Sequence, residues 1–288
     1  MNLAVIILQR DEALHIRRCL ERLAPLNPSE VFIVDSGSTD GSMDIAREAA
    51  AALHLNLHLC SHDWPGTQAR QFNWALDNLP ITAEWILRLD ADEYLYPETC
   101  EEVEKLIADV GLPSDVTSIS LSRARVFCNR KIRFGGTAHV LMVRFFKYGI
   151  GRCEDRAMDE HIVTSEGRDY RLKGEFTDHN LNTMDWWRDK HRGYAKREAQ
   201  DAIALFSDVT RLANPSLTDR KKIAYYRLPP YFRALAYFCL RYFLKGGFLD
   251  GIAGWRWHFW QGLWYRWLVD REIGRMGKNQ TASKEVAE

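Results

Sequence analysis

The stretch that decides the fold is Trp85-Ile86-Leu87-Arg88-Leu89-Asp90-Ala91-Asp92-Glu93. Its first five residues form a short, mostly apolar run, which predicts a buried β-strand. Asp90 and Asp92 follow this run directly, with one residue between them. In parallel sheets, ligands bind at the carboxyl ends of the strands. The stretch therefore predicts a parallel sheet with an acidic site at its edge.

The residues before this stretch alternate between strand and helix patterns. Short apolar runs predict strands at Leu3–Leu8, Val31–Val34 and Leu55–Cys60. Longer segments with helical periodicity predict helices at Asp11–Leu26, Met43–Leu53 and Thr67–Leu79. This alternation is typical of βαβ units, so the fold class is α/β, a Rossmann-like and mainly parallel sheet with helices on both faces.

Length and composition indicate an ordinary folded chain. The 288 residues are 46% apolar and 27% charged, which excludes disordered and fibrous proteins. Lys and Arg together number 39, as do Asp and Glu, so no overall charge indicates nucleic-acid binding. The six cysteines include no Cys-x-x-Cys pair and are expected to be reduced thiols of a cytosolic protein. The N-terminal run lacks a basic region, so it predicts a strand and not a signal peptide.

The carboxylate pair Asp90 and Asp92 is compatible with three kinds of site. It can form a solvated rim, orient the hydroxyl groups of a sugar or ribose, or hold one divalent cation. Carboxylate oxygens are the ligands that Mg²⁺ and Mn²⁺ prefer, and an open coordination shell leaves room for phosphate oxygens. Such a cation stabilises a departing diphosphate. Because the Asp-x-Asp tripeptide is common by chance, it does not choose between these interpretations by itself.

The order of the segments around the pair supplies the context. The turn Val34-Asp35-Ser36-Gly37-Ser38-Thr39-Asp40-Gly41-Ser42 follows a strand and is itself followed by helix, strand, helix and Leu89-Asp90-Ala91-Asp92-Glu93. This arrangement resembles the family-2 glycosyltransferases of the GT-A fold over about residues 1–205. The resemblance implies an inverting hexosyltransferase with a nucleotide-sugar donor, UDP-linked in the family's common case.

The resemblance also implies roles for individual residues. Residues expected to bind the nucleotide sugar are Asp11, Glu12, Asp35, Ser36, Arg70, Asn73, Asp90 and Arg144. Residues expected to bind Mn²⁺ or Mg²⁺ are Asp92, Asp90 and His179. The family's first strand usually ends in Asn-Glu, and Asp11-Glu12 stands in that place here, so which of these side chains touches the base stays open.

A second group of residues resembles a narrower subgroup of the family. Val143-Arg144-Phe145-Phe146-Lys147 is similar to a strand of enzymes that add hexoses to lipopolysaccharide core and related envelope glycans. In that subgroup an acidic residue near Met158-Asp159-Glu160-His161 is the catalytic base. A positioned carboxylate suffices to take the acceptor's proton, and we expect Glu160 to be the base in preference to Asp159 because Glu160 matches the subgroup best. An exposed acidic turn is the alternative interpretation.

The C-terminal region has a different composition. Residues 220–271 carry ten basic and two acidic side chains, a net charge of +8. Five tryptophans lie within thirteen positions, at Trp255, Trp257, Trp260, Trp264 and Trp267. Core packing explains an aromatic helical stripe in most proteins, but Trp combined with Lys and Arg is also typical of helices at a membrane interface. We therefore expect an anionic membrane surface as a partner of this region.

These patterns predict the following organisation. A catalytic domain spans residues 1–215, with a nucleotide-sugar half (1–95) and an acceptor half (96–215), and a helical membrane-associating region spans 216–272 before a flexible tail at 273–288. No uninterrupted apolar stretch reaches the roughly 18–20 residues needed to cross a bilayer. The expected location is the cytoplasmic face of the inner membrane, with a lipid-linked saccharide as acceptor in envelope polysaccharide or lipopolysaccharide synthesis.

Two other functions use similar features. A sugar-phosphate nucleotidylyltransferase has a comparable nucleotide half, but it normally carries a Gly-rich basic loop after the first strand, which Gln9-Arg10-Asp11-Glu12 lacks. A catalytically inactive scaffold docked on a membrane would keep the same fold without turnover. Hydrolysis of the donor in the absence of acceptor distinguishes an active enzyme from such a scaffold.

Overall fold

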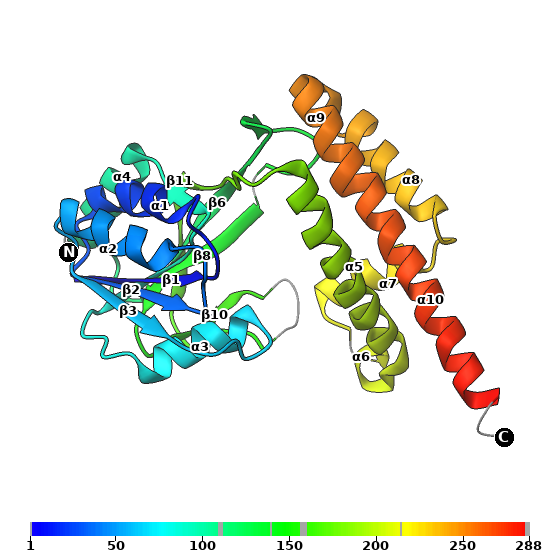
Figure 1. Ribbon diagram of the computed structural model, residues 1–288, viewed down its shortest axis with the longest axis horizontal. Helices are drawn as coiled ribbons and strands as arrows, with labels where there is room; N and C mark the ends of the chain where they lie inside the picture. The colour runs from blue at the N-terminus through cyan, green and yellow to red at the C-terminus, as the bar shows by residue number, and fades with distance from the viewer. Residues whose placement is uncertain (1, 109–111, 139, 156–159, 214, 286–288) are drawn as a thin grey trace. The chain divides into compact units, whose positions relative to one another are not determined.

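The computed structural model describes residues 2–108, 112–138, 140–155, 160–213 and 215–285. The chain divides into two compact units (Figure 1). The first comprises Met1–Lys131 and Thr137–Leu181, and the second comprises Ile132–Gly136 and Asn182–Glu288. The boundary thus lies after Leu181, whereas the sequence predicted it near residue 215. The reason is that helix α5 (Met184–Ser207) packs on helix α10 (Tyr265–Glu285) through a shared apolar cluster.

The first unit is built on one nine-stranded sheet with the path β3-β2-β1-β4-β8-β6-β11-β5 and β7 beside β6. Strands β1, β2, β3 and β4 are parallel neighbours, with the bounds Leu3–Gln9, Glu30–Asp35, Leu57–Ser61 and Trp85–Asp90. The later strands are β5 (Glu93–Leu95), β6 (Val116–Phe127), β7 (Arg130–Ile132), β8 (Val140–Lys147) and β11 (Arg168–Asp178). Strands β9 (Gly151–Cys153) and β10 (Ile162–Thr164) form a separate two-stranded sheet. The predicted α/β class is confirmed.

Helices cover both faces of the sheet, as predicted (Figure 1). Successive side chains of a strand point to opposite faces. In β1, Leu3, Val5 and Ile7 belong to one buried cluster, and Ala4, Ile6 and Leu8 belong to the other. The first cluster includes side chains of α1 (Ile16–Leu23), α2 (Ser42–Ala52) and α4 (Pro97–Ala108), and the second includes side chains of α3 (Gln68–Asn78).

One predicted helix begins later than the sequence pattern suggested. Helix α1 starts at Ile16 and is followed by a 3-10 turn at Ala24–Leu26, whereas the pattern predicted a helix from Asp11. Asp11 has a positive φ of 54°, in the left-handed region that a right-handed helix excludes. Residues 10–15 are therefore a loop at the carboxyl end of β1.

Apart from residues 132–136 and short connections, the second unit is helical within the described residues. Helix α5 is followed by α6 (Val209–Ala213), α7 (Leu217–Tyr226) and α8 (Phe232–Cys239). A π-helical turn η2 (Leu240–Leu244), a 3-10 turn η3 (Gly247–Asp250), α9 (Gly251–Trp257) and a second π-helical turn η4 (His258–Trp264) then lead to α10. Helix α10 continues to Glu285, through most of the segment predicted as a flexible tail. Among the described helices, none has both the length and the apolar character to span a membrane.

Candidate functional site

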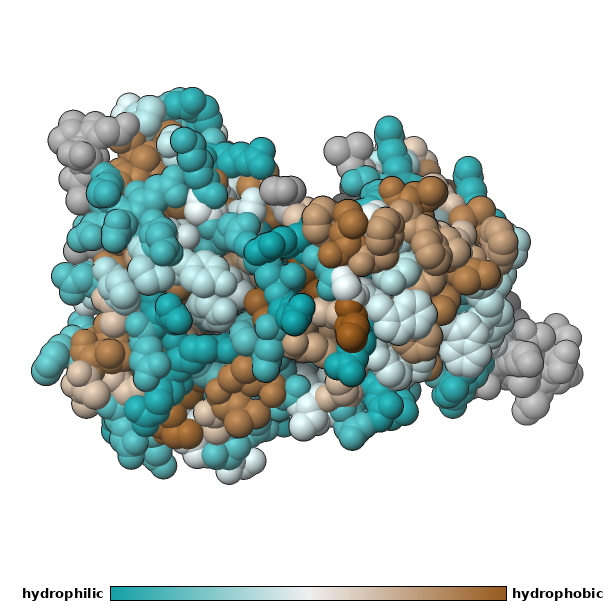
Figure 2. Space-filling view, turned by 90° about the horizontal axis from the view of Figure 1, so that it is seen from above, coloured by the Kyte–Doolittle hydropathy of each residue, from teal (hydrophilic) through white to brown (hydrophobic). Residues whose placement is uncertain are grey.

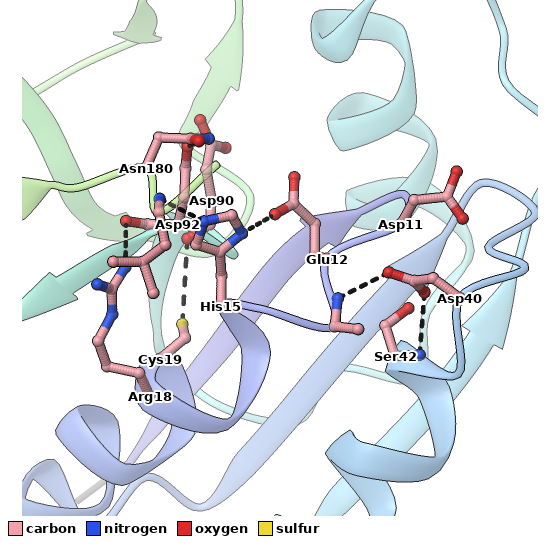
Figure 3. A network of polar contacts seen from close by, with 12 residues as sticks. Asp11, Glu12, His15, Arg18, Cys19, Asp40, Ser42, Asp90, Asp92 and Asn180 are labelled. Atoms are coloured by element: carbon pink, nitrogen blue, oxygen red, sulfur yellow. Dashed lines mark hydrogen bonds and ion pairs between the residues drawn. The ribbon is translucent and has the colours of Figure 1, made fainter. Parts of the chain in front are cut away.

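The carboxylate pair lies where the sequence predicted it, at the carboxyl end of β4. Strand β4 pairs with β1 on one side and with β8 on the other, so its end lies in the middle of the sheet. Asp90 is the last residue of β4, and Asp92 follows in the tight turn before β5. Figure 3 shows Asp90 and Asp92 beside the loop that follows β1. The parallel arrangement therefore brings the acids of two strand ends together.

Asp92 is half-buried and lies among other carboxylates. Its Oδ2 accepts a hydrogen bond from Asn180 Nδ2 at 3.0 Å. Burial is the main cause that raises the pKa of Asp92 to about 6, and the negative charges of Asp178 and Asp90 add to it. Like charges held together in a buried site raise one another's pKa and are relieved by a cation. The electrostatic environment therefore favours a positively charged ligand.

The two aspartates fit a divalent cation as a partial set of ligands. Asp90 Oδ1 is buried and has no hydrogen-bond partner among the described residues, although Arg88 Nη2 lies 4.0 Å away. Over the described parts of the chain, no group of three or more His, Cys, Asp and Glu side chains is spaced to hold a metal. Mg²⁺ commonly binds through one or two carboxylates, with substrate phosphates and water completing its shell. Asp90 and Asp92 meet that requirement with their oxygens.

His179 does not fit a metal in this arrangement. Its Nδ1 lies 3.2 Å from Arg18 Nη1, and its Nε2 lies 3.2 Å from Asn129 Oδ1. A guanidinium only donates, so Nδ1 accepts and the proton sits on Nε2, which donates to Asn129. Burial and the charge of Arg18 lower the pKa of His179, which keeps the ring neutral. Both nitrogens are occupied, so the geometry favours a structural role over the predicted role as a ligand.

Arg144 is a buried ion-pair partner, and its contacts do not support the predicted role in binding the nucleotide sugar. It lies on β8 and donates from Nη2 to Glu93 Oε1 at 2.5 Å, with the guanidinium 4.1 Å from the centre of the Phe176 ring. Glu93 Oε2 accepts in turn from the backbone amide of Asp90 at 3.1 Å. Arg144 thus acts through Glu93 to fix the backbone at Asp90, and its burial keeps it from direct contact with a ligand.

Glu160 is connected to the aspartate pair by Arg88. Arg88 lies on β4, two residues before Asp90, and is 5% exposed. Its Nη2 donates to Glu160 Oε1 at 2.9 Å and its Nη1 lies 3.0 Å from Cys153 Sγ. The carboxylates of Asp90 and Glu160 raise the pKa of Arg88 against the effect of burial. The buried guanidinium of Arg88 therefore lies between Glu160, the predicted base, and Asp90, the predicted acid on the metal side.

Asp159, the other candidate base, lies outside the described residues. Glu160 is 13% exposed on its side chain, so it is not the freely solvated turn residue that the alternative interpretation required. The arrangement leaves Glu160 as the carboxylate whose position the structure defines.

The loops after β1 and β2 are joined by reciprocal hydrogen bonds. Asp11 Oδ1 accepts from the amide of Thr39 at 2.8 Å, and the amide of Asp11 donates to Ser38 Oγ at 2.8 Å. Asp40 Oδ2 accepts from the amide of Ala13 at 2.8 Å (Figure 3). Asp11 therefore fixes one loop against the other, and that contact uses one of its two carboxylate oxygens.

Asp35 organises the turn after β2. Its Oδ2 accepts from the amides of Gly37 at 3.0 Å and Ser38 at 2.9 Å. Its Oδ1 accepts from the hydroxyl of Ser38 and from Gln9 Nε2. A carboxylate offers about four lone-pair positions, and the chain occupies all four here. A nucleotide base bound in this site would therefore contact the edge of the turn that Asp35 shapes, or replace one of the groups that now donate hydrogen bonds to Asp35.

Glu12 and Ser36 also have partners within the chain. Glu12 Oε2 lies 2.5 Å from Nδ1 of the buried His15, whose Nε2 accepts from the amide of Leu181 at 2.8 Å. This second bond fixes the tautomer, so Nδ1 carries the proton and donates to Glu12. Ser36 Oγ accepts from Gln71 Nε2 at 3.0 Å, which leaves the Ser36 hydroxyl proton available to a ligand.

Arg70 and Asn73 point to the segment around β9. Asn73 Nδ2 donates to the carbonyl of Cys153 at 2.9 Å, and its Oδ1 accepts from the amide of Cys153 at 3.0 Å. Arg70 donates to both carboxylate oxygens of Asp155, at 3.2 and 3.4 Å, from an exposed position. Asn73 thus holds the backbone at Cys153 through both ends of its amide, whereas the exposed Arg70 remains accessible to a nucleotide sugar.

Two functional residues were missed in the sequence, Arg88 and Arg18. Arg88 carried a usable signal, because a charged residue inside a continuous buried strand requires a partner of opposite charge. Arg18 lies on α1 and donates from Nη2 to the carbonyls of Asp92 at 3.3 Å and His179 at 2.5 Å. Nothing in the local sequence of α1 distinguishes Arg18 from the neighbouring basic residues, so its role could not be predicted.

The chain resembles known glycosyltransferases. Residues 4–121 match the family model described as glycosyl transferase family 2. The chain is 31% identical over 146 residues to the succinoglycan biosynthesis protein ExoA of Rhizobium meliloti, a match that covers 47% of this chain and 43% of ExoA. The chain therefore spans less than half the length of this curated relative.

Solved structures also resemble the chain. The mannosyltransferase PcManGT of Pyrobaculum calidifontis, determined with GDP-Man and Mn²⁺, is 17% identical with a TM-score of 0.47, over 90% of this chain and 87% of that one. TarS of S. aureus (residues 1–349), determined with UDP, is 25% identical with a TM-score of 0.36, over 45% of this chain and 37% of that one.

Proposed function

We propose that the chain transfers a sugar from a nucleotide donor to a saccharide acceptor, a function supported by the match of residues 4–121 to the model of glycosyl transferase family 2. The observation that carries the proposal is the pairing of Glu160 and Asp90 with one buried arginine, Arg88, at 2.9 and 4.0 Å. The shared guanidinium supports the proposal that Glu160 accepts a proton beside the acids proposed to face the donor's diphosphate. A transfer reaction needs both.

Asp90 and Asp92 are the residues that would hold a divalent cation. When bound, Mn²⁺ or Mg²⁺ neutralises charge on a departing diphosphate. The two half-buried carboxylates would supply oxygens to the cation, and Arg144 and Glu93 keep the backbone of Asp90 in place through the hydrogen bond from the Asp90 amide. His179 has no part in this proposal, because both of its ring nitrogens are engaged.

Glu160 is the proposed general base. Its carboxylate takes the proton of the acceptor hydroxyl as the hydroxyl oxygen attacks the anomeric carbon. The bond between that carbon and the diphosphate oxygen breaks at the same time, and its electron pair leaves with the nucleoside diphosphate. The attack from the opposite side inverts the anomeric centre. Arg88 is a positioning residue, since it fixes the direction of the Glu160 carboxylate without touching the reacting atoms.

The proposed donor and acceptor rest on likeness to other proteins. A UDP-linked sugar is proposed because the turn of residues 34–42 resembles the uracil-binding turn of the family, and Asp35 shapes that turn. A lipid-linked saccharide of envelope polysaccharide or lipopolysaccharide synthesis is the proposed acceptor, in line with the likeness to a succinoglycan biosynthesis protein. The proposed place of the reaction is the cytoplasmic membrane face.

A thermal-shift panel tests the donor. The full chain is heated with UDP-, GDP- and dTDP-sugars, each with and without Mn²⁺, because a ligand that binds the folded state raises the melting temperature. We expect a UDP-sugar with Mn²⁺ to give the largest increase and Mn²⁺ alone to give little. If no nucleotide sugar raises the melting temperature under any condition, the proposed function is wrong. Hydrolysis of the stabilising donor then distinguishes an enzyme from an inactive scaffold.

A further inference from the structure

The second unit exposes large apolar side chains at the end that carries α9. Six of them form what we call the apolar corner: Phe243, Leu244, Phe248, Leu249, Ile252 and Trp255. Leu244 is 81% exposed and Ile252 is 75% exposed, which is unusual for side chains of this size in a folded unit. Figure 2, which looks onto this end of the unit, shows apolar residues gathered there.

Ring contacts beneath the surface hold the apolar corner together. Tyr242 lies 6.3 Å from Phe248 and 5.5 Å from Trp255, measured between ring centres. Phe238 lies 6.2 Å from Phe243 and 5.7 Å from Trp255. The exposed residues of η2, η3 and α9 are therefore supported from below as one surface, and are not isolated apolar side chains.

The charges around the apolar corner have one sign. Lys245 and Arg256 are exposed within the same segment. Between residues 228 and 264 the sequence contains a single acidic residue, Asp250. Its Oδ2 accepts from the amides of Arg133 at 3.0 Å and Phe134 at 2.8 Å, so this carboxylate is directed to residues 132–136 of the same unit. The exposed charge beside the apolar corner is thus positive.

Of the five tryptophans that the sequence analysis singled out, Trp255 belongs to the apolar corner and the others do not. Trp257 is buried, and Trp260 and Trp264 are half-buried, with Trp264 packed against the cluster shared by α5 and α10. Trp267, on α10, is 42% exposed, so the predicted stripe of Trp260, Trp264 and Trp267 is only partly packed into the unit. The exposed apolar residues lie instead on the turns η2 and η3 and on α9.

We propose that the apolar corner docks into the interface of a bilayer that contains anionic lipids. Apolar side chains rimmed by Lys and Arg match the two layers of such an interface, acyl chains beneath negatively charged headgroups. A second copy of the chain fits less well, because a self-complementary contact places the same patch on both partners and would bring Lys245 and Arg256 of both copies together. The charge thus selects a lipid surface.

Vesicle co-sedimentation of the full chain tests the docking. We expect binding to phosphatidylcholine vesicles that contain about one third phosphatidylglycerol, and weaker binding as salt is raised, since exposed charges are screened. The double substitution Leu244→Ser with Ile252→Ser should weaken binding at least tenfold, because burial of each side chain supplies a large share of the affinity. The matched control is Val209→Ser, in which a side chain of 79% exposure on α6 is removed.

The control should bind as the unmodified chain does, and both variants should melt at an unchanged temperature. A second substitution set, Lys245→Gln with Arg256→Gln, should lower binding to anionic vesicles. The proposal is wrong if the unmodified chain does not sediment with the vesicles that contain phosphatidylglycerol. It is equally wrong if the Leu244→Ser, Ile252→Ser double substitution leaves binding to these vesicles unchanged. It is also wrong if the chain forms a dimer in sedimentation velocity that the double substitution abolishes. Because no donor or acceptor is present, these outcomes are independent of the proposed function.

Discussion

The Arg88 guanidinium donates to the Glu160 carboxylate at 2.9 Å, from a strand whose last residue is Asp90. The contact joins residues 72 positions apart in the sequence. It gives Glu160 a fixed position, 13% exposed on its side chain, next to the acids at the end of β4. This relationship makes Glu160 testable as a base and Arg88 testable as its positioning partner.

Glu160→Gln removes the proton acceptor and keeps the shape of the side chain. The amide oxygen can still accept from Arg88, so folding and donor affinity should change little. Turnover should fall about 10²–10⁴-fold, the usual contribution of a general base. The measurement is the steady-state kcat with the donor identified by thermal shift. Glu166→Gln, at an exposed position between β10 and β11, is the control and should keep normal kcat. Normal turnover of Glu160→Gln would show that another group is the base.

Arg88→Met should destabilise the first unit by about 3–5 kcal/mol, because it leaves the buried Glu160 carboxylate without its partner. The measurement is the free energy of unfolding by urea. The control is Arg152→Met, which breaks an exposed ion pair with Asp77 at 2.7 Å. An exposed pair contributes about 1 kcal/mol or less. If the two variants lose the same stability, Arg88 does not hold the site together.

Asn73→Ala distinguishes a structural role of Asn73, in which it holds the backbone of Cys153, from a role in binding the nucleotide sugar. The Asn73 amide makes both of its hydrogen bonds with the backbone of Cys153, so its loss should lower the unfolding free energy by about 1–3 kcal/mol. Donor affinity, measured by calorimetry, should change less than about twofold. Asn78→Ala removes one exposed bond to the carbonyl of Trp74 and should leave stability nearly unchanged. A large loss of donor affinity at unchanged stability would instead restore the role inferred from the family resemblance.

Gly247→Ala tests the packing of the second unit. A Cβ at Gly247 would lie 2.4 Å from the His258 ring, and the ring is buried, so it cannot move aside freely. The substitution should lower the melting temperature by several degrees, as overpacking typically costs about 1–3 kcal/mol. Gly193→Ala on α5 meets nothing within 4 Å and should raise stability by up to about 1 kcal/mol. Equal effects of the two substitutions would contradict the packing around His258.

The alternation of strand and helix was predictable because it leaves a local signal. Strand β1 (Leu3–Gln9) extends the predicted Leu3–Leu8 by one residue, and β2 (Glu30–Asp35) extends the predicted Val31–Val34 by one residue at each end. The start of α1 was mispredicted, because the left-handed backbone of Asp11 depends on its hydrogen bonds to the distant loop at Ser38 and Thr39. The boundary after Leu181 depends on packing between α5 and α10, which no local pattern reports.

The position of the candidate site in the sheet could be predicted better than the contacts that each of its side chains makes. Acids at strand ends identified Asp90 and Asp92, because parallel topology alone brings strand ends together. The roles of Asn73 and Asp35 could not be predicted, since their partners Cys153 and Gln9 meet them only in the folded sheet. Sequence resemblance reports which residues a family uses, whereas hydrogen-bond partners decide which of them remain available here.

Calorimetric titration of UDP in the presence and absence of Mn²⁺, for the unmodified chain and for Asp92→Asn, tests the central claim most directly. Asn keeps the size of the side chain and its contact with Asn180, but it removes one of the two carboxylates proposed to hold the cation. We predict that Mn²⁺ lowers the Kd of UDP for the unmodified chain by at least tenfold, and that Asp92→Asn reduces this gain to less than about twofold. Tight binding of UDP without any divalent cation, or an undiminished effect of Mn²⁺ on Asp92→Asn, would contradict the account.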